Sequence, residues 1–121
     1  MATTELGKEL RRLRIEEEER LLDMAGRLEK SAAFLSAVET GKKSPPSGFD
    51  DLVIRAYRLV GEAANKVRLA TDRSRRAFTL EGKTDLQRDT FGLMARKMHT
   101  LTDDELGQIL TILKARGGEH E

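Results

Sequence analysis

The chain lacks cysteine and tryptophan, and its only prolines are an adjacent pair at positions 45 and 46. Without cysteine there is no disulfide framework and no thiolate metal site, which fits the cytoplasmic location that we expect. Long apolar runs are also missing, since none approaches the ~20 residues that a helix needs to cross a bilayer. The first ten residues, "MATTELGKEL", turn amphipathic at once and contain no apolar signal core, so neither secretion nor membrane association is predicted.

Neither sign of charge is in excess. Charged residues make up 36% of the 121 residues, yet the net charge is only +1. Residues 1–80 carry 16 Lys+Arg and 13 Asp+Glu, a balance of +3, whereas residues 81–121 carry 6 and 8, a balance of −2. A mildly basic front is compatible with nucleic-acid binding, but ordinary surfaces also show such an imbalance.

Residues that could perform catalysis or bind metal are few and scattered. The two histidines, His99 and His120, have no cysteine near them and no paired spacing, so no metal site is expected. The acidic run from Glu16 to Glu19 reads as a solvated helix end and not as an acid/base pair. No Ser/His/Asp arrangement, phosphate loop or nucleotide fingerprint is present. We therefore expect a protein that is not an enzyme and has no cofactor.

Apolar residues recur at helical spacing through the first 70 residues, which predicts five helices there. The first three contain residues 6–13, 21–28 and 32–39, and the last two begin near residues 48 and 62. Thr3 or Thr4, Ser31 and Ser47 are the expected N-caps, Ser47 with Asp50 in a variant capping box. The segment "KKSPPSG", residues 42–48, breaks the chain between the third and fourth helices.

The remainder of the chain is predicted to be a connector followed by two helices. Residues 71–84 form the connector, in which "RRAFTLEG" alternates weakly and is compatible with one short strand that exposes Phe78 and Leu80 on one face. Such a strand would need a partner, because isolated strands are unstable. Residues 85–115 return to helical spacing, and Thr102 with Glu105 forms the best capping box in the chain. Residues 116–121 are expected to be a disordered tail.

Three segments carry a resemblance to a known family: "LGKELRRLR" at 6–14, "DMAGRL" at 23–28 and "FLSAVETGKKSPP" at 34–46. The third contains the ending S-x-[VI]-E-x-G-K-[KR]-x-P. With these segments the chain resembles the phage repressor/Cro-like, or XRE-family, helix-turn-helix transcriptional regulators, from Leu6 to about Leu69. The wording of "DMA" and "SAAFLSAVETGKK" is similar to small prophage-type and antitoxin-like members. The resemblance implies an all-α chain with a five-helix lambda-repressor-like DNA-binding domain, residues 1–70.

The resemblance also implies which residues would contact DNA, because the third helix of such a domain lies in the major groove. Base-edge positions fall on Ala32, Ala33, Ser36 and Ala37, with Ser31 and Lys30 at the helix start. Backbone contacts would come from Lys30, Thr40, Lys42 and Lys43. The alanines depart from the family pattern, because alanine can offer a base only its methyl group, and many relatives carry side chains that hydrogen-bond to bases.

Further positions allow two interpretations each. Family proteins often pair an arginine of the first helix with a glutamate of the third, here Arg14 and Glu39, as a structural lock; the alternative is two unrelated surface charges. Phe34 either fills the edge of the core or presses on DNA. Glu29 stands where the family often has glycine, so the turn must accept a positive φ without glycine or take another geometry. The basic cluster at 73–76 is either a solvated connector or a phosphate contact.

The expected function is that of a sequence-specific double-stranded DNA-binding transcriptional regulator, a dimeric autorepressor of prophage or antitoxin type on an inverted-repeat operator. Residues 85–115 are the expected dimerisation region; in the alternative, the last two helices pack on their own domain. A rival function is a protein-binding adaptor or antitoxin whose main partner is another protein, such as a toxin. A positive rim from Lys30 to Lys43 would favour DNA, and an exposed apolar patch there would favour a protein partner.

Overall fold

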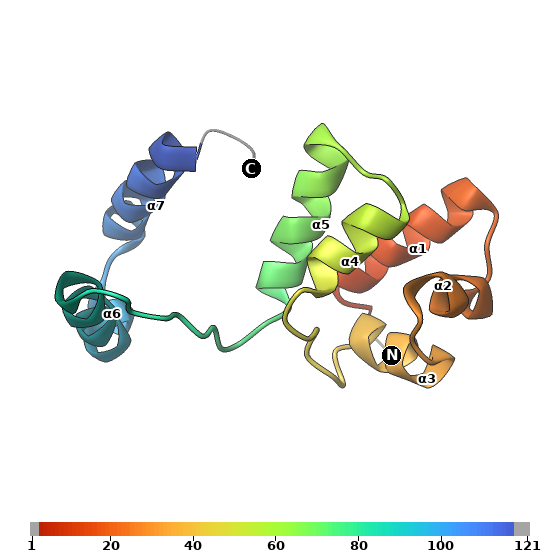
Figure 1. The fold of residues 1–121 in the computed structure, drawn as a ribbon, viewed down its shortest axis with the longest axis horizontal. Coiled ribbons are helices and arrows are strands. Elements are labelled where there is room, and N and C mark those ends of the chain that lie inside the picture. Colours follow the sequence, from red (N-terminus) through yellow and green to blue (C-terminus); the bar gives the residue numbers. More distant parts are fainter. Residues whose placement is uncertain (1–2, 118–121) are drawn as a thin grey trace. The chain divides into compact units, whose positions relative to one another are not determined.

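A computed structural model describes residues 3–117, and all regular structure in that range is helical (Figure 1). The elements are α1 (Glu5–Glu17), α2 (Leu21–Leu28), α3 (Ala32–Glu39), α4 (Phe49–Ala56), α5 (Gly61–Arg73), α6 (Asp85–Lys97), the 3₁₀ helix η1 (Met98–Thr100) and α7 (Asp103–Gly117). The all-α class is thus confirmed. None of the described helices combines the length and the apolar composition needed to span a membrane.

The chain divides into two compact units, the first ending at Ala77 and the second beginning at Phe78. The first unit contains α1 to α5, and the second contains α6, η1 and α7. Helix α5 extends to Arg73, beyond its expected end near Leu69, so the first three residues of the predicted connector are helical.

The first unit has a single apolar core to which all five helices contribute. Helix α1 packs against α5 and α3, while α2 packs against α3 and α4 (Figure 1). The fully or almost fully buried apolar residues are Leu6, Leu10, Leu13, Met24, Ala25, Leu28, Leu35, Val38, Phe49, Val53, Val67 and Ala70. These buried residues recur at helical spacing, whereas Leu22 of α2 is 73% exposed.

Side-chain caps define the starts of two helices in this unit. The hydroxyl of Thr4 accepts a hydrogen bond from the Gly7 amide at 2.9 Å, and the hydroxyl of Ser31 accepts one from Phe34 at 3.0 Å, as predicted. The predicted Ser47 cap is wrong. Helix α4 is preceded by Gly48, which has φ 82° and leaves no side chain to cap the helix, because the chain turns there through a left-handed conformation.

The short strand considered for the connector is absent. Residues 75–83 are irregular, and Phe78 and Leu80 are each 58% exposed. The physical reason is the lack of a second strand among residues 3–117, since a lone strand leaves its backbone groups and apolar face without partners.

Helix α7 of the second unit starts with the predicted capping box. The Thr102 amide donates to the Glu105 carboxylate at 2.9 Å, and the Glu105 amide donates to the Thr102 hydroxyl at 3.2 Å. Helix α7 includes Arg116 and ends at Gly117, so the expected disordered tail is wrong for these two positions. The rest of that expected tail, with His120, lies outside the described residues.

Candidate nucleic-acid interface

The C-terminal end of α3 is tied to the start of α1 by main-chain contacts. The backbone amide of Thr4 donates to the Glu39 carbonyl at 2.9 Å, and the Thr4 hydroxyl donates to the same oxygen at 3.1 Å. A carbonyl at a helix end has no partner within its own helix, so these two bonds satisfy a group that would otherwise be unpaired. Thr4 therefore caps α1 and anchors α3 at once.

Gly7 allows the two helices to approach this closely. A Cβ atom at position 7 would lie 2.4 Å from the Glu39 carbonyl oxygen and 2.5 Å from a methyl carbon of Thr3. Both distances are far below van der Waals contact. Sequence analysis did not single out this glycine, because a glycine inside a helix can be recognised as a contact point only when its neighbour is known.

The side chain of Glu39 forms the contact with Arg14 that the resemblance implied. Glu39 is buried, and its carboxylate pairs with both terminal nitrogens of Arg14, Nη2 lying 3.2 Å from Oε1. The Nε atom of Arg11 lies 3.7 Å from the same oxygen. Two-point guanidinium–carboxylate pairing is directional as well as strong. The backbone and the side chain of Glu39 are therefore both held by α1, which orients α3.

Helix α2, on which α3 rests, is held by a second polar cluster that sequence analysis missed. Glu19 accepts hydrogen bonds from Arg27 and, at 2.6 Å, from the Tyr57 hydroxyl. The Arg27 guanidinium lies 4.4 Å from the centre of the Tyr57 ring, an arrangement suited to a cation–π contact. Burial raises the pKa of Tyr57, and the hydrogen bond to Glu19 raises it further. Glu19 therefore stabilises the fold through these hydrogen bonds, and the expectation that the whole acidic run is solvated is wrong at this position.

The loop after α3 is fixed by Arg75, which lies two residues beyond the end of α5. Arg75 donates through Nε to the Pro45 carbonyl at 3.2 Å and through Nη2 to the Pro46 carbonyl at 2.6 Å. Arg73 pairs with Glu5 at 3.2 Å. Arg73 and Arg75 of the 73–76 cluster therefore have intramolecular partners, which neither the solvated connector nor the phosphate contact included.

The turn between α2 and α3 adopts a positive φ without glycine. Glu29 has φ 56° and ψ 43°, in the left-handed region. A side chain with a Cβ atom pays a conformational penalty there, which glycine avoids. Of the two possibilities for this turn, the structure thus shows the positive φ without glycine, at some cost in stability.

Glu29→Gly is accordingly expected to raise the free energy of unfolding by ~0.5–1 kcal/mol, because it relieves the positive φ. Urea denaturation measures the change. Lys66→Gly is the control, since Lys66 is exposed inside α5 and the same substitution there should cost ~1 kcal/mol. If both substitutions lowered the free energy of unfolding equally, the conformational penalty at Glu29 would be excluded.

The outward face of α3 is small and weakly polar. Ala33 and Ser36 are exposed, whereas Ala32 and Ala37 are half-buried. Ser31 is exposed at the N-cap, and the first amide groups of the helix follow it. The amides of Ala32 and Ala33 precede the capped amide of Phe34, have no acceptor within the helix and form a favourable site for an anion. The face can thus approach another molecule closely, and its hydroxyl groups are the only side-chain hydrogen-bonding groups it offers.

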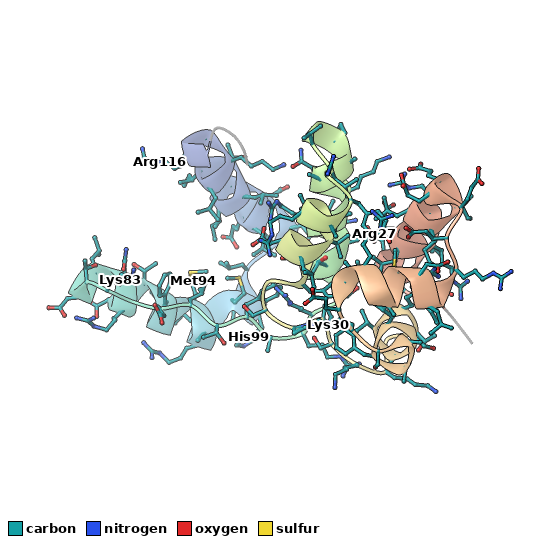
Figure 2. All side chains as sticks on the ribbon, turned by 45° about the vertical axis from the view of Figure 1, so that its right-hand side comes forward. Arg27, Lys30, Lys83, Met94, His99 and Arg116 are labelled. Carbon is teal, nitrogen blue, oxygen red and sulfur yellow. The ribbon has the colours of Figure 1, made fainter. Side chains whose placement is uncertain are left out.

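Lysines flank this face, and two of them are grouped around one aromatic ring. Lys30, next to the end of α2 (Figure 2), places its Nζ atom 5.4 Å from the centre of the Phe34 ring, and Lys43 places its Nζ atom 5.9 Å from it. Phe34 itself packs on the core with its ring centre 6.1 Å from that of Phe49, in line with the core-edge interpretation. Phe34 therefore brings together two cations from opposite ends of α3. Lys42 is exposed nearby in the chain.

Thr40 differs from the other residues that are expected to contact the DNA backbone. Its hydroxyl donates to the Ser36 carbonyl at 2.9 Å. A hydroxyl that already donates within the protein has no proton left for a phosphate oxygen. In this conformation Thr40 serves to end α3, and its side chain would need to rotate to contact a phosphate.

Comparison with known proteins identifies no relative: no protein-family model, no curated protein sequence and no solved structure matches the chain. The site must therefore be interpreted from its own geometry and charges.

Proposed function

We propose that the chain is a sequence-specific double-stranded DNA-binding transcriptional regulator with a lambda-repressor-like domain, and that α3 enters the major groove. The observation that carries the proposal is the surface around α3. Lys30 and Lys43 border it, and none of the large apolar side chains that are strongly exposed in residues 3–117 lies between positions 30 and 43. A positive rim without an apolar patch suits a phosphate backbone better than a protein surface.

The rigidity of α3 supports the same function. Its C-terminal end is anchored by Thr4, Gly7 and Arg14, and the helix beneath it is fixed by the Glu19 cluster. A reading helix must keep its angle to the duplex, since base contacts depend on hydrogen-bond geometry. These anchoring contacts would hold α3 at a constant angle in the major groove.

The side chains on α3 lead us to propose a particular division of labour. Affinity would come from the lysines and from the amides at the start of α3, which contact phosphates. Base reading would be sparse, through Ser31, Ser36 and alanine methyl groups against thymine. Specificity would then depend on DNA shape and on the spacing of two half-sites in an inverted repeat. From the resemblance, we propose that the chain is a regulator of the prophage or antitoxin type that represses its own operon.

Lys42→Ala is expected to weaken binding to every DNA sequence alike and to lower the slope of log K against log salt by ~0.9, the value for one phosphate contact. Binding titrations on an operator and on a random duplex, each at several salt concentrations, measure both effects. Lys66→Ala, an equal change of charge on the exposed side of α5, is the control and should leave the slope unchanged. A loss confined to one DNA sequence would mean that Lys42 reads a base.

The function as a whole is tested by recovering genomic DNA fragments bound by the full chain at moderate salt. A single inverted-repeat site is the expected result. Uniform, salt-sensitive recovery of all fragments, or none at all, would reject the regulator and favour the adaptor alternative.

A further inference from the structure

The second unit has apolar side chains but no core of its own. Within residues 78–116 no side chain is buried. Among residues 3–116, eleven large apolar residues are strongly exposed, and seven of them belong to this unit: Phe78, Leu80, Leu86, Leu93, Leu110, Ile112 and Leu113. A hollow of about 320 Å³ beside α6 and η1 is lined mainly by apolar residues, among them Met94 (Figure 2). This unit therefore leaves most of its apolar surface uncovered.

Uncovered helices of this length are not stable alone. Helices α6 and α7 contain 13 and 15 residues. Isolated helices of ~12–15 residues are marginal in water, and helices in proteins derive most of their stability from packing an apolar face. The apolar face of α7, formed by Leu106, Ile109, Leu110 and Leu113, thus requires a covering surface.

The charges of α7 indicate what covers it. Its first turn holds three acidic residues, Asp103, Asp104 and Glu105, and its last turn holds two basic ones, Lys114 and Arg116. Two copies of α7 placed antiparallel would set each acidic start beside the basic end of the other copy. A parallel pair would instead bring like charges together at both ends. This face is therefore complementary to itself under a two-fold axis, as an isologous interface must be.

We infer that α7 pairs antiparallel with α7 of a second copy of this chain, and that the second unit is folded by this pairing. The second copy is the partner of the regulator proposed above, and the role of the dimer rests on that proposed function. The pairing itself follows from the second unit alone. Opposed helix dipoles add to the complementarity of the charges. The occupant of the apolar face is thus this chain itself, and not a different protein.

Sedimentation equilibrium of the full chain without DNA tests the pairing. A dimer across micromolar concentrations is expected, and Leu110→Lys should convert it to monomer with a loss of helical circular dichroism. Gln108→Lys is the matched control, because it adds the same charge to an exposed position off the apolar face, and it should remain dimeric. A monomeric wild-type chain, or equal dissociation by both variants, would overturn the inference.

The orientation is tested by disulfide trapping, which the cysteine-free chain makes unambiguous. In an antiparallel pair, Glu105→Cys on one copy lies near Arg116→Cys on the other. A disulfide is therefore expected when the two variants are mixed, and not within either variant alone. Cross-linking within a single variant, or none in the mixture, would overturn the antiparallel arrangement. Both measurements omit DNA, so the dimer and the DNA-binding function can fail independently.

Discussion

Glu39→Ala is expected to lower the free energy of unfolding by ~3 kcal/mol, because it leaves the Arg14 guanidinium without its carboxylate. The side chains of Arg14 and Glu39 are only 11% and 4% exposed, so water compensates little for the lost partner. Arg11, whose Nε lies 3.7 Å from the carboxylate, would also lose an attraction. Urea denaturation of the full chain measures the change.

Glu16→Ala provides the control for this prediction. Glu16 also pairs with an arginine, Arg12, at 2.8 Å, but the two side chains are 57% and 39% exposed. Exposed pairs of this kind contribute only ~0.3–0.5 kcal/mol. A Glu→Ala substitution should therefore lower the free energy of unfolding slightly at position 16 and strongly at position 39. The difference between the two variants measures how much burial strengthens the ion pair.

A double-mutant cycle adds a second measurement. If Arg14 and Glu39 stabilise the fold through each other, Arg14→Ala with Glu39→Ala should cost at least ~1 kcal/mol less than the sum of the single substitutions. DNA affinity should fall in both single variants although neither residue is expected to touch DNA. Additive losses would show that the two residues act separately, and an unchanged melting temperature together with unchanged DNA binding would remove the lock altogether.

Gly7→Ala is expected to destabilise the first unit by ~2 kcal/mol, within the range for overpacking a closely packed site. The added Cβ would meet the Glu39 carbonyl oxygen at 2.4 Å and the Thr3 side chain at 2.5 Å. The carbonyl belongs to the backbone, so α3 must move away from α1 to accommodate it. This movement would lengthen both hydrogen bonds from Thr4 to Glu39 and tilt the proposed reading helix.

Gly26→Ala makes the comparison direct, because both glycines lie inside helices of the same unit. A Cβ at position 26 would meet nothing within 4 Å. The higher helix propensity of alanine should therefore stabilise this variant by ~0.5–1 kcal/mol. Opposite signs for the two glycines are the expected result of parallel urea titrations, with amide NMR shifts at Thr4 reporting the movement. If Gly7→Ala were as stable as Gly26→Ala, the close approach of α1 and α3 would not constrain the fold.

The features that could be predicted from the sequence are local ones. Helix starts at Thr4, Ser31 and Thr102 were predicted because a cap acts on amides two or three residues away. Two predictions based on weak local signals failed. Gly48 in a left-handed conformation precedes α4 in place of the Ser47 cap, and residues 75–83 form no strand, because residues 3–117 contain no partner strand. The contact between Arg14 and Glu39 was predicted only through the resemblance, since nothing in a 25-residue separation indicates proximity.

By itself, the sequence determined that this chain forms helices, where most of them begin and which faces are apolar, because these properties depend on residues within one or two turns. Only the tertiary structure decided that Gly7 admits the end of α3, that Glu19 joins Arg27 to Tyr57, and that Arg75 holds the proline loop. Within the second unit, it also left Leu110 and Leu113 of α7 exposed. These outcomes depend on distances between segments remote in sequence, which exist only once the helices have packed.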